Sequence, residues 1–341
     1  MPPNLCQYLG ELPKTLDETY NQILKGINKA QKGNAHRLLQ CLAIAVQPLL
    51  VEELVELLAF NFQATSLGGG PTLKEDWWWD DEEEAVLSTC SSLITIIPHA
   101  DSQVVQFSHF SVKEYLTSPH LTWSPHSDVS RFRIDIEPVH TIMEQACLVT
   151  LLQLNDHAGN GNTKLSLVKY AAKHWLDHAQ FGKVPLRVWA QMDDLFDISK
   201  PHFASWLQVH NMDQKWYNFS PHSQDGVSSL LYYATFCGFY DMAEHLITKH
   251  PEQVQAHGGH NIFPLQAALY NRHLHVADLL YQHGVAVDVQ GIYGNTPLCA
   301  ASSNGQVNHL EKPKCLIFPV DAEFTNSLPK SSKFNKLLSV L

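Results

Sequence analysis

The stretch VVQFSHFSVKEYL, residues 104–116, gathers side chains whose types could do chemistry. Ser108 and His109 have the residue types of a nucleophile and its base. Neighbouring side chains in a chain diverge, however, and a third group would be needed to orient the base. We therefore predict no catalytic residue in this stretch.

The same stretch predicts the start of a helix. Ser111 and Glu114 have the spacing of a capping box, in which the serine hydroxyl accepts from the Glu114 amide and the carboxylate reaches back. His109 lies just before this start, where free amides and the helix dipole favour an anion. The residues leave two interpretations of His109, a phosphate contact or a structural histidine, and by themselves favour the structural one.

Other chemical motifs are absent from the sequence. There is no GxxxxGK[ST] loop, because GGGPTLK at 68–74 has the wrong spacing, and no GxSxG, HExxH or zinc-knuckle pattern. His273 and His275 are two residues apart on a predicted outer helix, so they point apart, and His257 and His260 merely flank two glycines. We predict a non-enzymatic protein with no metal site and no cofactor.

Several elements must position residues 104–116. Apolar residues at helical spacing predict helices over 14–30, 35–46 and 51–60, and a further helix from residue 82. LITIIPHADSQVVQF predicts two strands around a turn at 98–102, and a helix follows. Three helices, a hairpin and a helix are typical of a winged helix. The segment EDWWWDDEEE before the fourth helix reads as an exposed loop and an acidic first turn, with a binding surface on Trp77–Trp79 as the alternative.

The rest of the chain is predicted to be helical. Residues 126–218 form a helical spacer with its own aromatic core. Leu231, Leu265 and Leu298 then recur 34 and 33 residues apart, and TPL-x-x-A is typical of ankyrin repeats. Arg272 replaces the glycine that stands at the turns of Gly238 and Gly305. The fold class is therefore mainly α, with a small α+β winged-helix domain (35–125), the spacer, two full and one partial ankyrin repeats (219–310), and an irregular or mobile tail (311–341).

Composition limits the possible partners and location. The net charge of −11 disfavours a nucleic-acid or anionic-membrane binder. Seven widely spaced cysteines without a CxxC pair, together with the lack of a signal peptide or a long apolar stretch, indicate a reduced, cytoplasmic protein. We expect a protein partner on the ankyrin face, and the candidate contact residues are Asn261, Tyr270, Asn271, Tyr293 and Asn295. The alternative for each of them is a turn or capping role.

Five runs of residues resemble fungal NACHT–ankyrin proteins of the STAND, NLR-like signalling class. The runs are LPKTLDETYNQIL, HRLLQCLAIAVQPLLVEELVELLA, VLSTCSSLI, VVQFSHFSVKEYLTS and YAAKHWLDHAQ. The winged-helix part is similar to the winged-helix domain of GPI inositol-deacylase. The resemblance implies an ATPase domain before the winged helix, ADP or ATP as its ligand, and a histidine that reads the nucleotide phosphate. By its position in the motif, that histidine resembles His109.

The sequence departs from this class in one large respect. It lacks the P-loop and starts where the ATPase domain should end, so residues 1–34 resemble a helical remnant of that domain. We expect a regulatory or protein-interaction module that binds a protein and possesses a docking surface for a NACHT ATPase domain. Two alternatives are a DNA-binding winged helix and an NTPase or hydrolase. The first is disfavoured by the acidic start of its recognition helix, the second by the missing motifs.

Overall fold

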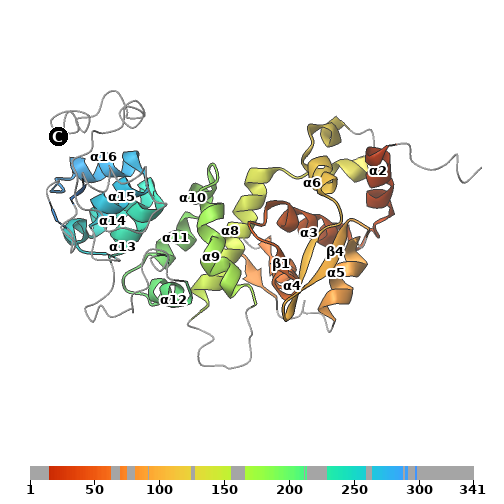
Figure 1. Cartoon of the computed structure of the whole chain (residues 1–341), viewed down its shortest axis with the longest axis horizontal. Helices are drawn as coiled ribbons and strands as arrows, with labels where there is room; N and C mark the ends of the chain where they lie inside the picture. The colour runs from red at the N-terminus through yellow and green to blue at the C-terminus, as the bar shows by residue number, and fades with distance from the viewer. Residues whose placement is uncertain are drawn as a thin grey trace, which may run out of the picture. The chain divides into compact units, whose positions relative to one another are not determined.

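A computed structural model of the chain (Figure 1) confirms the mainly α fold class. It describes residues 15–62, 70–74, 81–90, 92–123, 127–154, 166–210, 212, 229–258, 263–286, 289–290 and 296–297. The chain forms two compact units, residues 1–210 and 211–341. Each unit is described by itself below.

The first part of the first unit is the winged helix. Its elements in chain order are α2 (Leu16–Gly26), α3 (Lys32–Ile44), β1 (Leu49–Leu50), α4 (Val51–Ala59), β2 (Phe60–Asn61), β3 (Thr72–Leu73), α5 (Glu82–Cys90), β4 (Ile94–His99), β5 (Ser102–Phe107) and α6 (Phe110–Thr117). The predicted helices and hairpin are confirmed. The strand β1 was not predicted, because two apolar residues carry no periodic signal. It pairs antiparallel with β5 and gives a three-stranded sheet of order β1-β5-β4.

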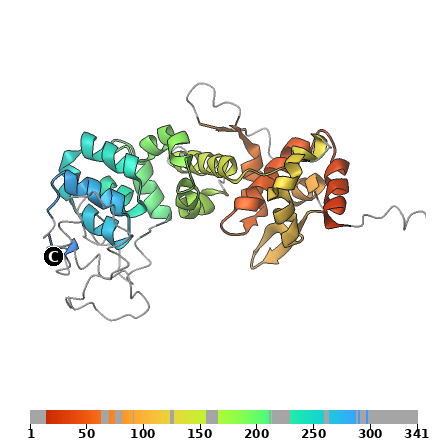
Figure 2. The ribbon, with the colours of Figure 1, turned by 90° about the horizontal axis from the view of Figure 1, so that it is seen from above.

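The hairpin β4–β5 has the tight turn that its sequence predicts. His99 pairs with Ser102, so only Ala100 and Asp101 lie between the strands. Ala100 takes a φ of 50°, a left-handed backbone that a two-residue hairpin turn requires. Figure 2 shows the hairpin extending beyond the helices of this unit. At the other end of the sheet, Val105 is buried against the helices.

The second part of the first unit is the helical spacer. It comprises η3 (Pro119–Trp123), α7 (Ser127–Ser130), α8 (Ile136–Leu152), α9 (Val168–Ala179), α10 (Val184–Arg187), α11 (Trp189–Leu195) and α12 (His202–Val209). The predicted aromatic core is present, because Trp175 contacts Trp206 with ring centroids 5.1 Å apart and both rings are fully buried. Helix α8 packs on α9 and on α3 of the winged helix. The spacer and the winged helix therefore belong to one compact unit.

The second unit contains the ankyrin helices α13 (Leu230–Cys237), α14 (Tyr240–Lys249), α15 (Pro264–Tyr270) and α16 (Leu274–Gln282), with η5 (Pro251–Gln255) after α14. Gly238 ends α13 with a φ of 78°, and Arg272 has a φ of 63° after α15. This confirms that Arg272 takes the place of a turn glycine. Thr235 joins the two repeats, because its hydroxyl lies 3.1 Å from the Pro264 carbonyl oxygen.

The third predicted repeat is described only at its start. Pro297 is helical and buried, as expected for the first turn of an inner helix. Gly305 and the predicted tail at 311–341 lie outside the described residues, as do Trp77–Trp79 and residues 1–14.

Candidate functional site

His109 is the N-cap of α6. Its Nδ1 accepts a hydrogen bond from the backbone N–H of Ser111 at 3.2 Å, and the helix begins at Phe110. The predicted capping box is therefore wrong: Ser111 is the second helical residue and not the cap. The reason is that the imidazole reaches the free amide first, which leaves the serine hydroxyl available for other partners.

The hydroxyl of Ser111 connects His109 to a different helix. It lies 2.6 Å from His109 Nδ1 and 2.6 Å from the hydroxyl of Tyr20 on α2. Because the Ser111 amide donates to Nδ1, this nitrogen is an acceptor, and the neutral ring carries its proton on Nε2. Tyr20 then donates to Ser111, which donates to His109. This arrangement holds the imidazole in one orientation and leaves Nε2–H as a hydrogen-bond donor on the opposite ring edge.

The surroundings of His109 are exposed and aromatic. His109 is exposed, and the neighbouring Phe110 keeps 69% of its surface in solvent, with the two ring centroids 4.3 Å apart. Ser108 does not bond to this histidine, because its hydroxyl donates to the Ser92 carbonyl at 3.4 Å. The site therefore presents one oriented N–H donor beside an exposed phenyl ring at the N-terminus of a helix.

The fourth helix of the winged helix, α5, has the acidic first turn that the sequence predicts. Asp81 accepts from the Glu84 amide at 2.9 Å, which caps the helix. Glu83 and Glu84 are exposed, and Glu83 also accepts from the side chain of Gln103 on the wing at 3.1 Å. The carboxylates thus cover the start of the helix that would be presented to a groove of DNA.

The ankyrin residues proposed as partner contacts are not brought together by the described part of the structure. Asn271 ends α15, and its side-chain amide donates to the Ala267 carbonyl at 3.1 Å, which is a structural role. Tyr270 is half-buried. Asn261, Tyr293 and Asn295 lie outside the described residues.

The histidines of the ankyrin unit have structural surroundings. His273 precedes α16 and does not lie on it, which corrects the prediction, and its Nε2 is 3.1 Å from the Phe236 carbonyl oxygen. His257 packs on Phe263 with ring centroids 4.2 Å apart. Across the residues with described placement, no group of three or more His, Cys, Asp or Glu side chains could hold a metal ion.

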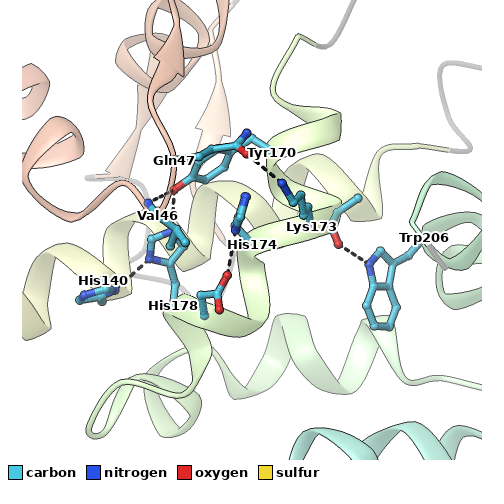
Figure 3. Close-up of polar contacts among 10 residues, drawn as sticks. Val46, Gln47, His140, Tyr170, Lys173, His174, His178 and Trp206 are labelled. Atoms are coloured by element: carbon cyan, nitrogen blue, oxygen red, sulfur yellow. Dashed lines mark hydrogen bonds and ion pairs between the residues drawn. The ribbon is translucent and has the colours of Figure 1, made fainter. Parts of the chain in front are cut away.

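A buried polar chain in the spacer was missed by the sequence analysis (Figure 3). His140 Nδ1 and His178 Nδ1 are 2.8 Å apart, and His178 Nε2 is 2.9 Å from the Tyr170 hydroxyl. That hydroxyl accepts from the backbone N–H of Val46 at 3.3 Å. One signal was available: Tyr170, His174 and His178 stand four residues apart, so they share one face of α9.

Burial changes the titration of several groups in this region. It lowers the pKa of His178 to about 3 and lowers that of His140. It raises the pKa of Glu56 to about 7 and that of Glu144 well above its ordinary value. Glu56 lies on α4 and accepts from the Leu167 amide at 3.0 Å, so it binds the start of α9 to the winged helix.

Comparison with known protein families identifies two parts of the chain. Residues 21–126 match the GPI inositol-deacylase winged-helix domain, and residues 230–316 match ankyrin repeats in three copies. The chain is also similar to the azaphilone pigments biosynthesis cluster protein L of Monascus ruber, with 30% identity over 302 residues. This match covers 82% of the chain and 61% of the relative, so the chain spans about three fifths of the relative's length. No helix in the described ranges is long and apolar enough to cross a membrane.

Proposed function

Because the chain combines a winged-helix domain of the GPI inositol-deacylase type with ankyrin repeats, we propose that it is a non-enzymatic regulatory module of the STAND, NLR-like class. The ankyrin repeats bind a protein partner. The winged helix docks on a NACHT ATPase domain, and His109 faces the phosphate of the nucleotide bound there. The geometry of His109 is the observation that carries this proposal.

The physical support is the single orientation of the imidazole. Nδ1 is occupied by Ser111, so Nε2–H is the only atom of the neutral ring that can donate to an oxygen. The ring stands at the N-terminus of α6, where the helix dipole favours negative charge. A phosphate oxygen fits both features. The hydroxyls of Tyr20 and Ser111 hold the imidazole of His109 in the orientation that presents Nε2–H.

The phosphate has to come from another domain, because the sequence has no P-loop to hold it. A titration of this chain with ATP and ADP tests that part of the proposal. We expect no binding in the micromolar range. Micromolar affinity for either nucleotide would show that the chain binds nucleotides by itself, and the regulatory proposal would fail.

A second experiment tests His109 directly. Where a P-loop is encoded in frame upstream, the longer protein is purified with ADP, and release of ADP is measured for His109→Ala. We expect release at least about tenfold faster, as for the loss of one charge-assisted hydrogen bond. Glu114→Gln, at an exposed position of the same helix, is the control and should leave the rate unchanged. An unchanged rate for His109→Ala, or an upstream sequence without a P-loop, contradicts the proposal.

DNA binding is disfavoured by the exposed carboxylates of α5, which repel a phosphate backbone. The test is a gel shift at low salt, where electrostatic binding is strongest, and tight binding would overturn this judgement.

For the ankyrin repeats, the test is recovery of a protein partner from the source cells by the full chain. Recovery should be lost with Tyr270→Ala and retained with Phe181→Ala, a change in the other unit.

We also propose a cytoplasmic location, which fits the burial of the described thiols.

A further inference from the structure

We propose that the contact between spacer helix α9 and the winged helix is a proton-sensitive clasp, formed by the chain Val46–Tyr170–His178–His140. In this proposal, one proton added to the pair His140–His178 removes the hydrogen bond between Tyr170 and Val46. The inference does not depend on the function of His109, because the two sites share no residue.

One assignment of the hydrogen bonds gives every group of the chain a partner when both imidazoles are neutral. The Val46 amide is a donor, so the Tyr170 oxygen accepts from it and its own hydrogen is donated to His178 Nε2. A neutral His178 then carries its proton on Nδ1 and donates to His140 Nδ1. His140 ends the chain as an acceptor. This neutral arrangement gives each of the four groups a partner without placing two donors against each other.

One added proton breaks this arrangement. A proton on His140 Nδ1 places two N–H donors 2.8 Å apart. If His178 moves its own proton to Nε2 in response, that N–H faces the Tyr170 hydroxyl. The hydroxyl hydrogen then loses its acceptor. A buried hydroxyl hydrogen without an acceptor costs free energy, which favours opening of the chain. We expect the opening at its longest bond, the 3.3 Å contact with Val46.

The chain has an outer end where a proton can arrive. His178 is fully buried, whereas His140 keeps 8% of its surface exposed. The ring of Phe181 stacks on His140 with centroids 4.0 Å apart, and this phenylalanine is itself 42% exposed. Phe181 thus covers the outer histidine, and movement of one exposed ring gives water access to it.

Charged and titratable neighbours do not supply a counterion for an extra proton. Lys113 on α6 acts against a charge on His140, and His174 acts against a charge on His178 while its own ring is bonded to Asp177. Glu137 precedes His140 by three residues but pairs with Arg187. Burial raises the pKa values of the remaining groups near Tyr170 and along α8, which disfavours a negative charge on each of them: Cys41, Glu53, Glu144 and Cys147.

Two other contacts hold α9 to the winged helix and do not involve the chain. Glu56 accepts from the Leu167 amide, and the Lys173 ammonium donates to the Gln47 side chain at 3.0 Å. They keep α9 attached when the chain opens, so the expected change is a local loosening at Val46 and not unfolding. The amide of Ala171 donates to the Leu167 carbonyl oxygen at 2.8 Å, a backbone acceptor that does not titrate, and it is therefore an internal reference for the amide of Val46.

The test is amide hydrogen exchange of the full chain, measured at Val46 and Ala171 between pH 7.5 and 5.5 and corrected for the intrinsic rate. The opened imidazoles titrate near their ordinary pKa of about 6.5, and the closed ones resist protonation. The opened population should then rise about tenfold per pH unit below that value. Protection of Val46 should fall accordingly relative to that of Ala171.

Variants separate the clasp from a general acid effect. His140→Gln and His178→Gln should each abolish the pH dependence at Val46. His36→Gln is the matched control, because His36 is another poorly exposed histidine of this unit, bonded at 3.3 Å to the Arg133 carbonyl oxygen. It should leave the dependence intact. The proposal is overturned if Val46 and Ala171 lose protection together, or if both glutamine variants respond to pH as the unchanged chain does.

Discussion

At the scale of single residues, the nearest hydrogen-bond partner of a side chain sets the role of that side chain in this protein. His109 captures the Ser111 amide, so the serine hydroxyl turns to Tyr20 and the imidazole becomes an oriented donor. At the ankyrin turn, both backbone conformation and space require a glycine. Gly238 has a φ of 78°, and a Cβ added there would overlap the His273 ring.

The first prediction concerns this glycine. Gly238→Ala should destabilise the ankyrin unit by ~2–4 kcal/mol, which combines the cost of a left-handed alanine with that of overpacking. Gly284→Ala separates the two costs, because Gly284 has a φ of 79° and nothing within 4 Å of the added Cβ. It should cost only ~1 kcal/mol. Urea unfolding measures both, and equal losses would show that the His273 overlap is relieved without cost.

At the scale of elements, buried polar groups join helices that are distant in the sequence. Glu56 on α4 accepts from the amide of Leu167, the residue before α9. The Thr235 hydroxyl on α13 lies within hydrogen-bond distance of the Pro264 carbonyl oxygen at the start of α15. Each side chain therefore reports on one contact between elements. This makes single substitutions informative.

The second prediction is a pH dependence at Glu56. Its pKa is raised to about 7 by burial, so between pH 4.5 and 7 the unfolded chain releases a proton that the folded chain keeps. The free energy of unfolding should therefore fall as pH rises through this window, by up to ~3 kcal/mol from this group, and level off above it. Glu56→Gln should reduce the slope, measured by urea unfolding from pH 4.5 to 7.5, and the raised pKa values of Glu53 and Glu144 account for the slope that remains. Glu52→Gln on the same helix should not, and an equal slope in all three proteins would contradict the assignment.

The third prediction tests the bond between repeats. Thr235→Val keeps the shape of the side chain but removes a buried hydroxyl that lies 2.8 Å from the Tyr232 carbonyl oxygen within α13 and 3.1 Å from the Pro264 carbonyl oxygen. The loss should cost ~1–2 kcal/mol in the free energy of unfolding. Thr248→Val is the matched control, because its hydroxyl is exposed and donates only to Glu244 within α14. The control should cost less than ~0.5 kcal/mol. If both variants lose the same stability, the bond to Pro264 contributes nothing.

At the scale of the whole molecule, the chain has two cores. Trp175 and Trp206 are buried in the first unit, and Tyr232 and Leu265 in the second. The fourth prediction follows from this division. Gly238→Ala should lower the unfolding temperature of one calorimetric transition, and Trp206→Ala that of the other. A single transition shifted by both substitutions would show that the units unfold together.

Features that depend on local rules could be predicted from the residues alone. Helical spacing located the helices, the residues between Pro98 and Ser102 located the hairpin turn, and the repeat of Leu231 and Leu265 located the ankyrin units. These signals lie within a few residues of one another or recur at a fixed period. A backbone conformation could also be anticipated, since Arg272 stands where a repeat needs a left-handed residue.

Only the tertiary structure decided which polar groups meet. Ser111 and Tyr20 are 91 residues apart, and His140 and His178 are 38 apart, so no local pattern predicts either contact. The raised pKa of Glu56 likewise comes from burial by the helices packed around it. Hydrogen bonding and titration depend on neighbours in space and on exclusion of water. Both are properties of the folded chain, and the sequence contains them only through the fold.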